Sequence, residues 1–139
     1  MFDFIGRKKS TNKTKILIVD DEPDLVQTLQ DRLEMNGYSI VTAGNGREGL
    51  ERAVEEKPDI ILLDVIMPIM DGLQMLEALS KHPECKQCAV IMLTARSQRQ
   101  DIVRAKTCGV VDYVVKPFDL GELIEKIENV LEHHSVAAK

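Results

Sequence analysis

The stretch that most constrains the fold is an apolar run that ends in a carboxylate. Four consecutive apolar residues, Ile60 to Leu63, lead directly into Asp64, and a turn that contains Pro68 follows. An apolar run this short, bounded by turn signals, is typical of a strand buried on both faces, as in a parallel sheet. Asp64 would then stand at the carboxyl end of this strand, the edge at which open α/β sheets bind ligands. We therefore expect Asp64 to be the working residue of the chain.

Four other apolar runs alternate with segments of helical periodicity. We predict strands at 15–19, 38–43, 60–63, 89–93 and 110–115. Between them, apolar residues recur at the three- and four-residue spacing of helices that bury one face. The most regular helix is the last, which follows Asp119 and is expected to end near His133. Five strands alternating with five helices predict a three-layer α/β/α fold, with a parallel sheet joined by right-handed crossovers.

Residues typical of helix ends support these boundaries. Pro23 suits the first turn of the first helix, and Gly37 suits its end. Asp71 is interpreted as part of the turn or cap that starts the third helix. Three pairs have the spacing of a capping box: Asn45 and Glu48, Ser97 and Gln100, and Asp119 and Glu122.

Length and charge point to one domain with short extensions. A chain of 139 residues can form one domain with a real core, but not two. We expect a flexible basic tail at 1–13, a domain at 14–133 and a C-terminal stub at 134–139. The tail carries a net charge of +3 and the whole chain −5, so the remainder carries −8. This acidic body argues against a nucleic-acid surface within the domain.

The sequence also bears on location. No apolar run approaches the roughly 20 residues that a membrane span needs. The first residues lack the long apolar segment of a signal peptide. We therefore expect a cytoplasmic protein, which is either a stand-alone domain or one excised from a longer chain.

Cys85 and Cys88 form a C-x-x-C pair, which is compatible with a redox pair or half of a zinc site. No second such pair or spaced histidine pair completes a metal site. The pair also precedes a predicted strand, not a helix start that would activate a thiolate. We favour two small loop residues, and we interpret Cys108 as part of the core.

Polar residues stand at the ends of four predicted strands: Asp20 and Asp21, Asp64, Thr94, and Lys116. Parallel strands bring their carboxyl ends to one edge, so these side chains should meet in one small site. Clustered carboxylates repel each other unless a cation lies among them, and a few oxygen ligands suit Mg²⁺. The remaining carboxylate could accept a phosphoryl group, with the ammonium and hydroxyl stabilising it. Taken singly, each residue would be a helix cap or a solvated surface group.

Four motifs resemble the receiver domains of two-component response regulators, over about 14 to 132. They are Ile18-Val19-Asp20-Asp21-Glu22-Pro23, Asp64-Val65-Ile66-Met67-Pro68-Ile69-Met70-Asp71-Gly72, Thr94-Ala95 and Lys116-Pro117-Phe118. The resemblance implies a flavodoxin-like receiver fold with strand order 2-1-3-4-5. It also implies a signalling phosphoprotein rather than a metabolic enzyme, which assists its own phosphotransfer and autodephosphorylation.

The resemblance assigns the site residues. Asp64 would be the phosphoacceptor in a Mg²⁺-dependent reaction, with Mn²⁺ as the alternative ion. Asp21 and Asp64 would bind the metal directly, Asp20 more through water, and Ile66 through its backbone carbonyl. Lys116 would neutralise the phosphoryl group, and its bond to Pro117 is expected to be cis.

The resemblance also implies a switch. Thr94 would bond to the phosphoryl group and move inward, and the rotamer of Tyr113 would follow; alternatively, Tyr113 is a half-buried strand aromatic. Ala95 is small, which leaves room for the phosphoryl group. Ile66 and Arg96 should border the path of water to that group. We hypothesise that they shield it and slow autodephosphorylation.

The implied partners are proteins. A histidine kinase or a histidine phosphotransfer protein would donate the phosphoryl group, as in a phosphorelay. The output would be a downstream effector protein that binds the surface of the fourth helix, fifth strand and fifth helix. The chain would be a monomer or a dimer that phosphorylation favours, formed through that surface.

Three other functions are alternatives to this one. A phosphatase of the haloacid dehalogenase type would need a second Asp where Ile66 stands. A flavin carrier would need a phosphate-binding loop rich in Ser, Thr and Gly, where the chain has Asp20-Asp21-Glu22. A binding module that is never phosphorylated is the more serious alternative.

Overall fold

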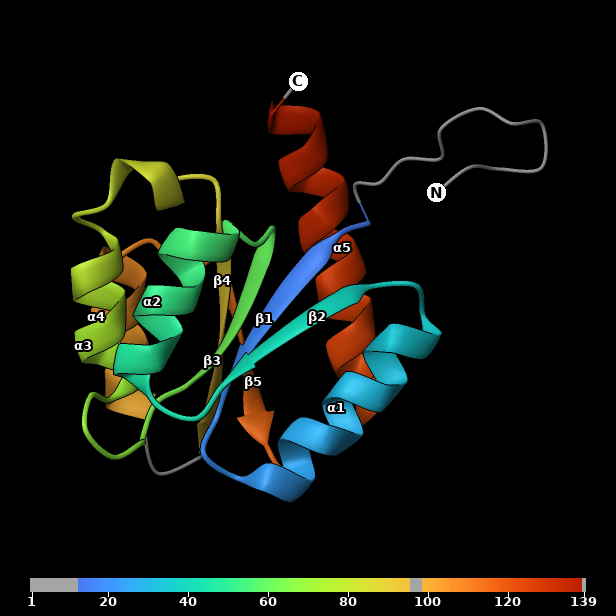
Figure 1. Cartoon of the computed structure of the whole chain (residues 1–139), viewed down its shortest axis with the longest axis horizontal. Coiled ribbons are helices and arrows are strands. Elements are labelled where there is room, and N and C mark those ends of the chain that lie inside the picture. Colours follow the sequence, from blue (N-terminus) through green and yellow to red (C-terminus); the bar gives the residue numbers. More distant parts are fainter. Residues whose placement is uncertain (1–12, 96–98, 139) are drawn as a thin grey trace.

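The computed structural model describes residues 13–95 and 99–138. Five strands alternate with five α-helices, and a short 3₁₀ helix, η1, precedes β4 (Figure 1). In chain order the elements are β1 (Lys15–Val19), α1 (Pro23–Met35), β2 (Ser39–Ala43), α2 (Gly46–Glu56), β3 (Ile60–Asp64), α3 (Gly72–Leu79), η1 (Pro83–Cys85), β4 (Ala89–Ala95), α4 (Arg99–Thr107), β5 (Asp112–Lys116) and α5 (Leu120–Ala138).

The strands form one parallel sheet in the order β2-β1-β3-β4-β5, which confirms the predicted fold. Helices α1 and α5 cover one face, and α2, α3 and α4 cover the other (Figure 1). Within the residues described, no helix is long and apolar enough to cross a membrane. The predicted tail falls outside these residues apart from Lys13, so the proposed division of the chain stays a prediction.

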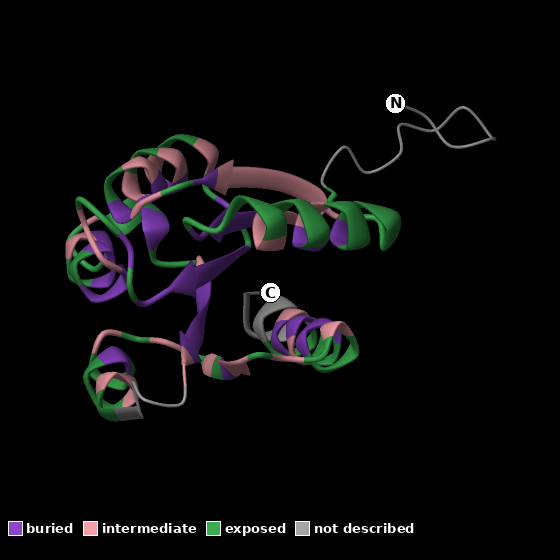
Figure 2. Cartoon of the chain, turned by 90° about the horizontal axis from the view of Figure 1, so that it is seen from below, coloured by how far each residue is buried: buried purple, intermediate pink, exposed green. Residues whose placement is uncertain are grey.

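The sheet separates two apolar clusters, one under each helical layer. Every residue of β3 is buried, as expected for a central strand packed on both faces (Figure 2). Consecutive residues of β3 point to opposite faces, and both faces are therefore apolar up to its last residue. That residue is Asp64, so the predicted burial of this strand is confirmed.

Several element ends differ from the predictions. β4 continues to Ala95, and β5 begins at Asp112 and includes Lys116, so Thr94 and Lys116 belong to the strands themselves. Helix α5 runs to Ala138, and the expectation that it ends near His133 is wrong. The residues after His133 include no proline or glycine, so no helix-breaking residue ends the helix there.

The predicted caps at α2, α3 and α5 are formed, with different partners in two cases. Asp71 and Gln74 make a complete capping box at α3. At α2, the Asn45 side chain accepts the Glu48 N–H at 2.9 Å, but the Glu48 carboxylate accepts from Gly44 instead of Asn45. At α5, the Asp119 side chain accepts from Gly121, not Glu122, and Ser97 lies outside the described residues.

Two glycines hold the loop between β3 and α3. The Gly72 N–H donates to the Val65 carbonyl at 2.7 Å, and a Cβ at Gly72 would clash with the Asp64 carbonyl oxygen. The Gly46 N–H donates to the Met70 carbonyl at 2.8 Å, where a Cβ would likewise clash. These close approaches fix the loop directly after the candidate phosphoacceptor.

The same loop contains a strained residue. Ile69 has a φ of 70°, and the Met70 N–H donates to the Pro68 carbonyl across it at 2.7 Å. A three-residue turn with a positive φ at its centre is rare, and a β-branched residue is poorly suited to it. The Ile69 side chain is 75% exposed, so little burial offsets the strain.

Replacing Ile69 with Gly should therefore stabilise the fold. We expect the free energy of unfolding in urea to rise by about 0.5–1 kcal/mol, because Gly adopts this conformation without a Cβ clash. The control is Val111→Gly, an exposed apolar position without a positive φ, where the same change should destabilise. A lower stability for Ile69→Gly would contradict the assignment of strain.

Candidate functional site

The carboxyl ends of four strands deliver the predicted polar residues to one edge of the sheet. Asp20 directly follows β1, Asp64 ends β3, Thr94 is the second-last residue of β4, and Lys116 ends β5. Asp20, Asp64 and Thr94 are buried, whereas Asp21 is exposed. The parallel register explains this convergence, because neighbouring strands end at nearly the same level.

Lys116 links the acidic residues across the site. Its Nζ lies 2.8 Å from Asp20 Oδ2 and 3.4 Å from Asp64 Oδ1. It also lies 3.0 Å from Glu22 Oε1, a contact that the sequence analysis did not foresee. Glu22 is visible in the sequence as the third acid after β1, but its distance from Lys116 along the chain hides the pairing. The bond between Lys116 and Pro117 is cis, as expected.

The Asp64 carboxyl group is destabilised in its charged form. Burial and the neighbouring charge of Asp20 raise its pKa to about 6, although Lys116 opposes the shift. For Lys116, burial lowers the pKa of the ammonium, but hydrogen bonds to Asp20 and Glu22 outweigh this effect and raise the pKa overall. The lysine therefore stays cationic and partly compensates an excess of negative charge.

The three aspartates fit a small divalent cation. One carboxylate oxygen from each of Asp20, Asp21 and Asp64 lies within 4.8 Å of the other two. Oxygen donors from few protein groups suit Mg²⁺, which keeps several waters and also accepts phosphate oxygens; Mn²⁺ accepts similar ligands. A cation here would also relieve the repulsion that raises the pKa of Asp64.

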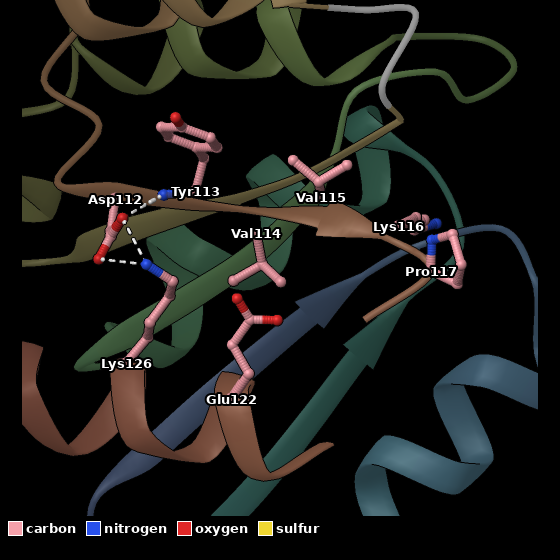
Figure 3. A pocket seen from close by; sticks show the side chains of 8 residues that line it. All are labelled: Asp112, Tyr113, Val114, Val115, Lys116, Pro117, Glu122 and Lys126. Atoms are coloured by element: carbon pink, nitrogen blue, oxygen red, sulfur yellow. Dashed lines mark hydrogen bonds and ion pairs between the residues drawn. The ribbon is translucent and has the colours of Figure 1, made fainter. Parts of the chain in front are cut away.

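Of the remaining predicted residues, the structure describes Thr94, Tyr113 and Ile66. The Thr94 hydroxyl donates to the Ala95 carbonyl at 3.1 Å. Tyr113 is 37% exposed and lies on the side of β5 opposite Val114, which faces α5 (Figure 3). Ile66 is 65% exposed, two residues after Asp64. Arg96 lies outside the described residues, so its role stays a prediction.

The cysteines lie away from this edge, in a hollow near η1. Cys85, Cys88 and Cys108 line it and are all free thiols. Burial raises the pKa of Cys85 and raises that of Cys88 to about 12. Protonated thiols are poor nucleophiles, which agrees with a structural role.

Comparison with known proteins identifies relatives of this site. Residues 16–128 match the family model of the response regulator receiver domain. Over 89% of its length, the chain is 39% identical to the alkaline phosphatase synthesis transcriptional regulatory protein PhoP of Bacillus subtilis, covering 51% of that protein. It is also 39% identical to protein PilH of Pseudomonas aeruginosa, covering 84% of this chain and 97% of PilH. The chain thus spans about half the length of PhoP but nearly all of PilH.

Solved structures agree with this. A CheY-like receiver domain from Methanospirillum hungatei has a TM-score of 0.84 at 29% identity, over 90% of this chain and 98% of its own. The response regulator TrrA of Thermotoga maritima, solved with Mg²⁺ and BeF, has a TM-score of 0.75 at 35% identity, over 85% of this chain and 99% of its own.

The raised pKa of Asp64 predicts an effect on stability. The pKa of Asp64 is higher in the folded state than in the unfolded state. Its protonated form therefore favours the folded state below about pH 4, and this contribution to the free energy of unfolding is lost as pH rises through about 6. In metal-free buffer at pH 7.5, Asp64→Asn should raise the free energy of unfolding by about 1–2 kcal/mol.

The difference in free energy of unfolding between Asp64→Asn and the parent protein should narrow as pH falls toward 4. Mg²⁺ should stabilise the parent protein more than this variant. Urea titrations at both pH values, with and without Mg²⁺, measure both effects. Asp31→Asn, on the exposed face of α1, is the control and should change little. A gap that does not depend on pH would contradict the cause given for the shift.

Proposed function

This chain belongs to the family of response regulator receiver domains, and from that premise we propose that it accepts a phosphoryl group on Asp64 in a Mg²⁺-dependent reaction. The family is one of signalling proteins rather than metabolic enzymes. The observation that best supports the proposal is the pairing of a buried, destabilised Asp64 carboxylate with Asp20, Asp21 and Lys116. We place the reaction in the cytoplasm.

The residues of the site divide the chemistry between them. An Asp64 oxygen attacks phosphorus, forming an O–P bond as the N–P bond to a phosphohistidine breaks and the released nitrogen takes a proton. Asp21, Asp64 and the Ile66 carbonyl would hold Mg²⁺ directly and Asp20 more through water, and the ion would neutralise charge on the transferring group. Lys116 pairs with the phosphoryl oxygens, and the Thr94 hydroxyl donates to one of them.

We propose that phosphorylation is passed on to a partner protein through the surface next to this site. Movement of Thr94 toward the phosphoryl group would bias Tyr113 and the surface of α4, β5 and α5. That surface carries the exposed apolar side chains of Val103, Val111 and Tyr113, and a hollow of about 580 Å³ lies along β5 and α5 (Figure 3). Exposed apolar groups of this kind suit a protein partner.

We propose two kinds of protein partner, one that donates the phosphoryl group and one that responds to phosphorylation. A histidine kinase or phosphotransfer protein donates the phosphoryl group, and the exposed side chains of Ile66 and Ile69, in the loop that follows Asp64, offer it apolar contacts. An effector protein, or a second copy in a phosphorylation-favoured dimer, binds the α4-β5-α5 surface. The acidic domain itself does not contact nucleic acid.

Incubation with acetyl phosphate and Mg²⁺ tests the phosphoacceptor. Intact mass should rise by about 80 Da, the mass of one phosphoryl group replacing a proton. The gain should be lost in Asp64→Asn and after chelation of Mg²⁺, and it should be slow in Lys116→Ala.

Asp71→Asn is the matched control, because Asn also caps a helix and the change leaves the proposed phosphoacceptor in place. It should gain the same mass as the parent chain. A folded parent chain that gains no mass would favour the passive binding module instead.

The phosphoryl lifetime tests the roles of Ile66 and Arg96. Replacing Ile66 with Asn and Arg96 with Glu should open the path of water and speed loss of the added mass severalfold. The decay is followed by intact mass after removal of acetyl phosphate. An unchanged decay rate in the double variant would refute the shielding hypothesis.

A further inference from the structure

One carboxylate of the site has no part in the chemistry described above. Glu22 Oε1 accepts a hydrogen bond from Lys116 Nζ at 3.0 Å, yet Glu22 is neither the phosphoacceptor nor one of the proposed metal ligands. We infer that Glu22 is a positioning residue that holds the Lys116 ammonium toward the start of α1 and thereby limits its approach to a phosphoryl group on Asp64. The inference rests on the proposed roles of Asp64 and Lys116.

Two of the three N–H donors of the Lys116 ammonium already have hydrogen-bond partners. A lysine ammonium carries three N–H donors, and three carboxylates surround Lys116, with Asp20 and Glu22 nearer than Asp64. Only the two nearer carboxylates accept hydrogen bonds of good geometry. The third N–H makes no such bond to Asp64 Oδ1, which is 3.4 Å away, so the two bonds already made hold the ammonium back from a close approach to a phosphoryl group on Asp64.

The Glu22 contact is the one most easily released. The Asp20 side chain is fully buried, whereas that of Glu22 is 62% exposed and can return to water. An exposed ion pair is weak, while a buried carboxylate that loses its partner is strongly penalised. Glu22 is therefore the contact that yields as Lys116 moves.

Among the residues that the structure describes, Lys116 is the one partner of the Glu22 side chain. Glu22 is the N-cap residue of α1, yet its side chain forms no capping hydrogen bond. Its N–H donates to Asp20 Oδ1 at 3.0 Å, and its carbonyl accepts from Val26 at 3.0 Å. Serine, threonine, aspartate and asparagine are the preferred caps, so helix capping does not account for this glutamate.

A contact that is present at rest and lost in the transition state slows a reaction. Releasing Lys116 from Glu22 should therefore speed phosphorylation. We test this with Glu22→Gln, which removes the charge, and Glu22→Asp, which keeps the charge but shortens the side chain. Aspartate at this position is also drawn to the helix N–H groups and away from Lys116.

The rate of mass gain is measured with acetyl phosphate and Mg²⁺. Both variants should react about 2- to 5-fold faster than the parent, the size expected for loss of an exposed ion pair. The control is Asp24→Asn, which removes an exposed charge two residues away that forms no ion pair in the described part of the chain. It should change the rate by less than about 2-fold. Urea titrations of all variants show that each remains folded.

The outcomes separate the inference from the proposed function. A parent chain that gains no mass refutes the proposed function. A parent that gains mass, with both Glu22 variants unchanged or slower, overturns the inference alone. Acceleration in Glu22→Gln but not in Glu22→Asp would also overturn it, because charge and not contact with Lys116 would then explain the effect.

Discussion

The structure depends on a concentration of negative charge at one edge of an apolar sheet. Asp20 and Asp64 are buried there beside exposed Asp21, and the Lys116 ammonium reaches both buried carboxylates. Burial of like charges is unfavourable, so the site is organised to receive positive charge. A divalent cation would supply it, and the cation and Lys116 would also offset the further negative charge of a phosphoryl group on Asp64.

The fold supplies the rigidity that this arrangement needs. β3 is buried throughout and packed between two apolar layers, so its last residue has little freedom. The loop that follows is held by hydrogen bonds from Gly46 and Gly72 to nearby carbonyl groups. The chemistry proposed for Asp64 would therefore take place on a fixed support, while the side chains of Glu22 and Ile66 are exposed to solvent.

Much of this could be predicted because the signals are local. Apolar runs predicted the five strands, and capping residues supported the helix boundaries. The alternation of strands with helices predicted the layers. Boundaries were less accurate at α5, where no residue after His133 stops a helix. Metal coordination, phosphorylation and the switch at Thr94 and Tyr113 rest on family resemblance and chemistry, and they remain proposals.

By itself, the sequence showed which polar residues stand at or next to the ends of four strands, and parallel pairing then required Asp20, Asp64, Thr94 and Lys116 to share an edge. It could not determine which groups touch. The pairing of Lys116 with Glu22, 94 residues apart, depends on the relative placement of β5 and the start of α1. The degree of burial that raises the pKa of Asp64 likewise arises only when both helical layers close over the sheet. Such distances and solvent exclusion are properties of the packed chain, because no local pattern encodes them.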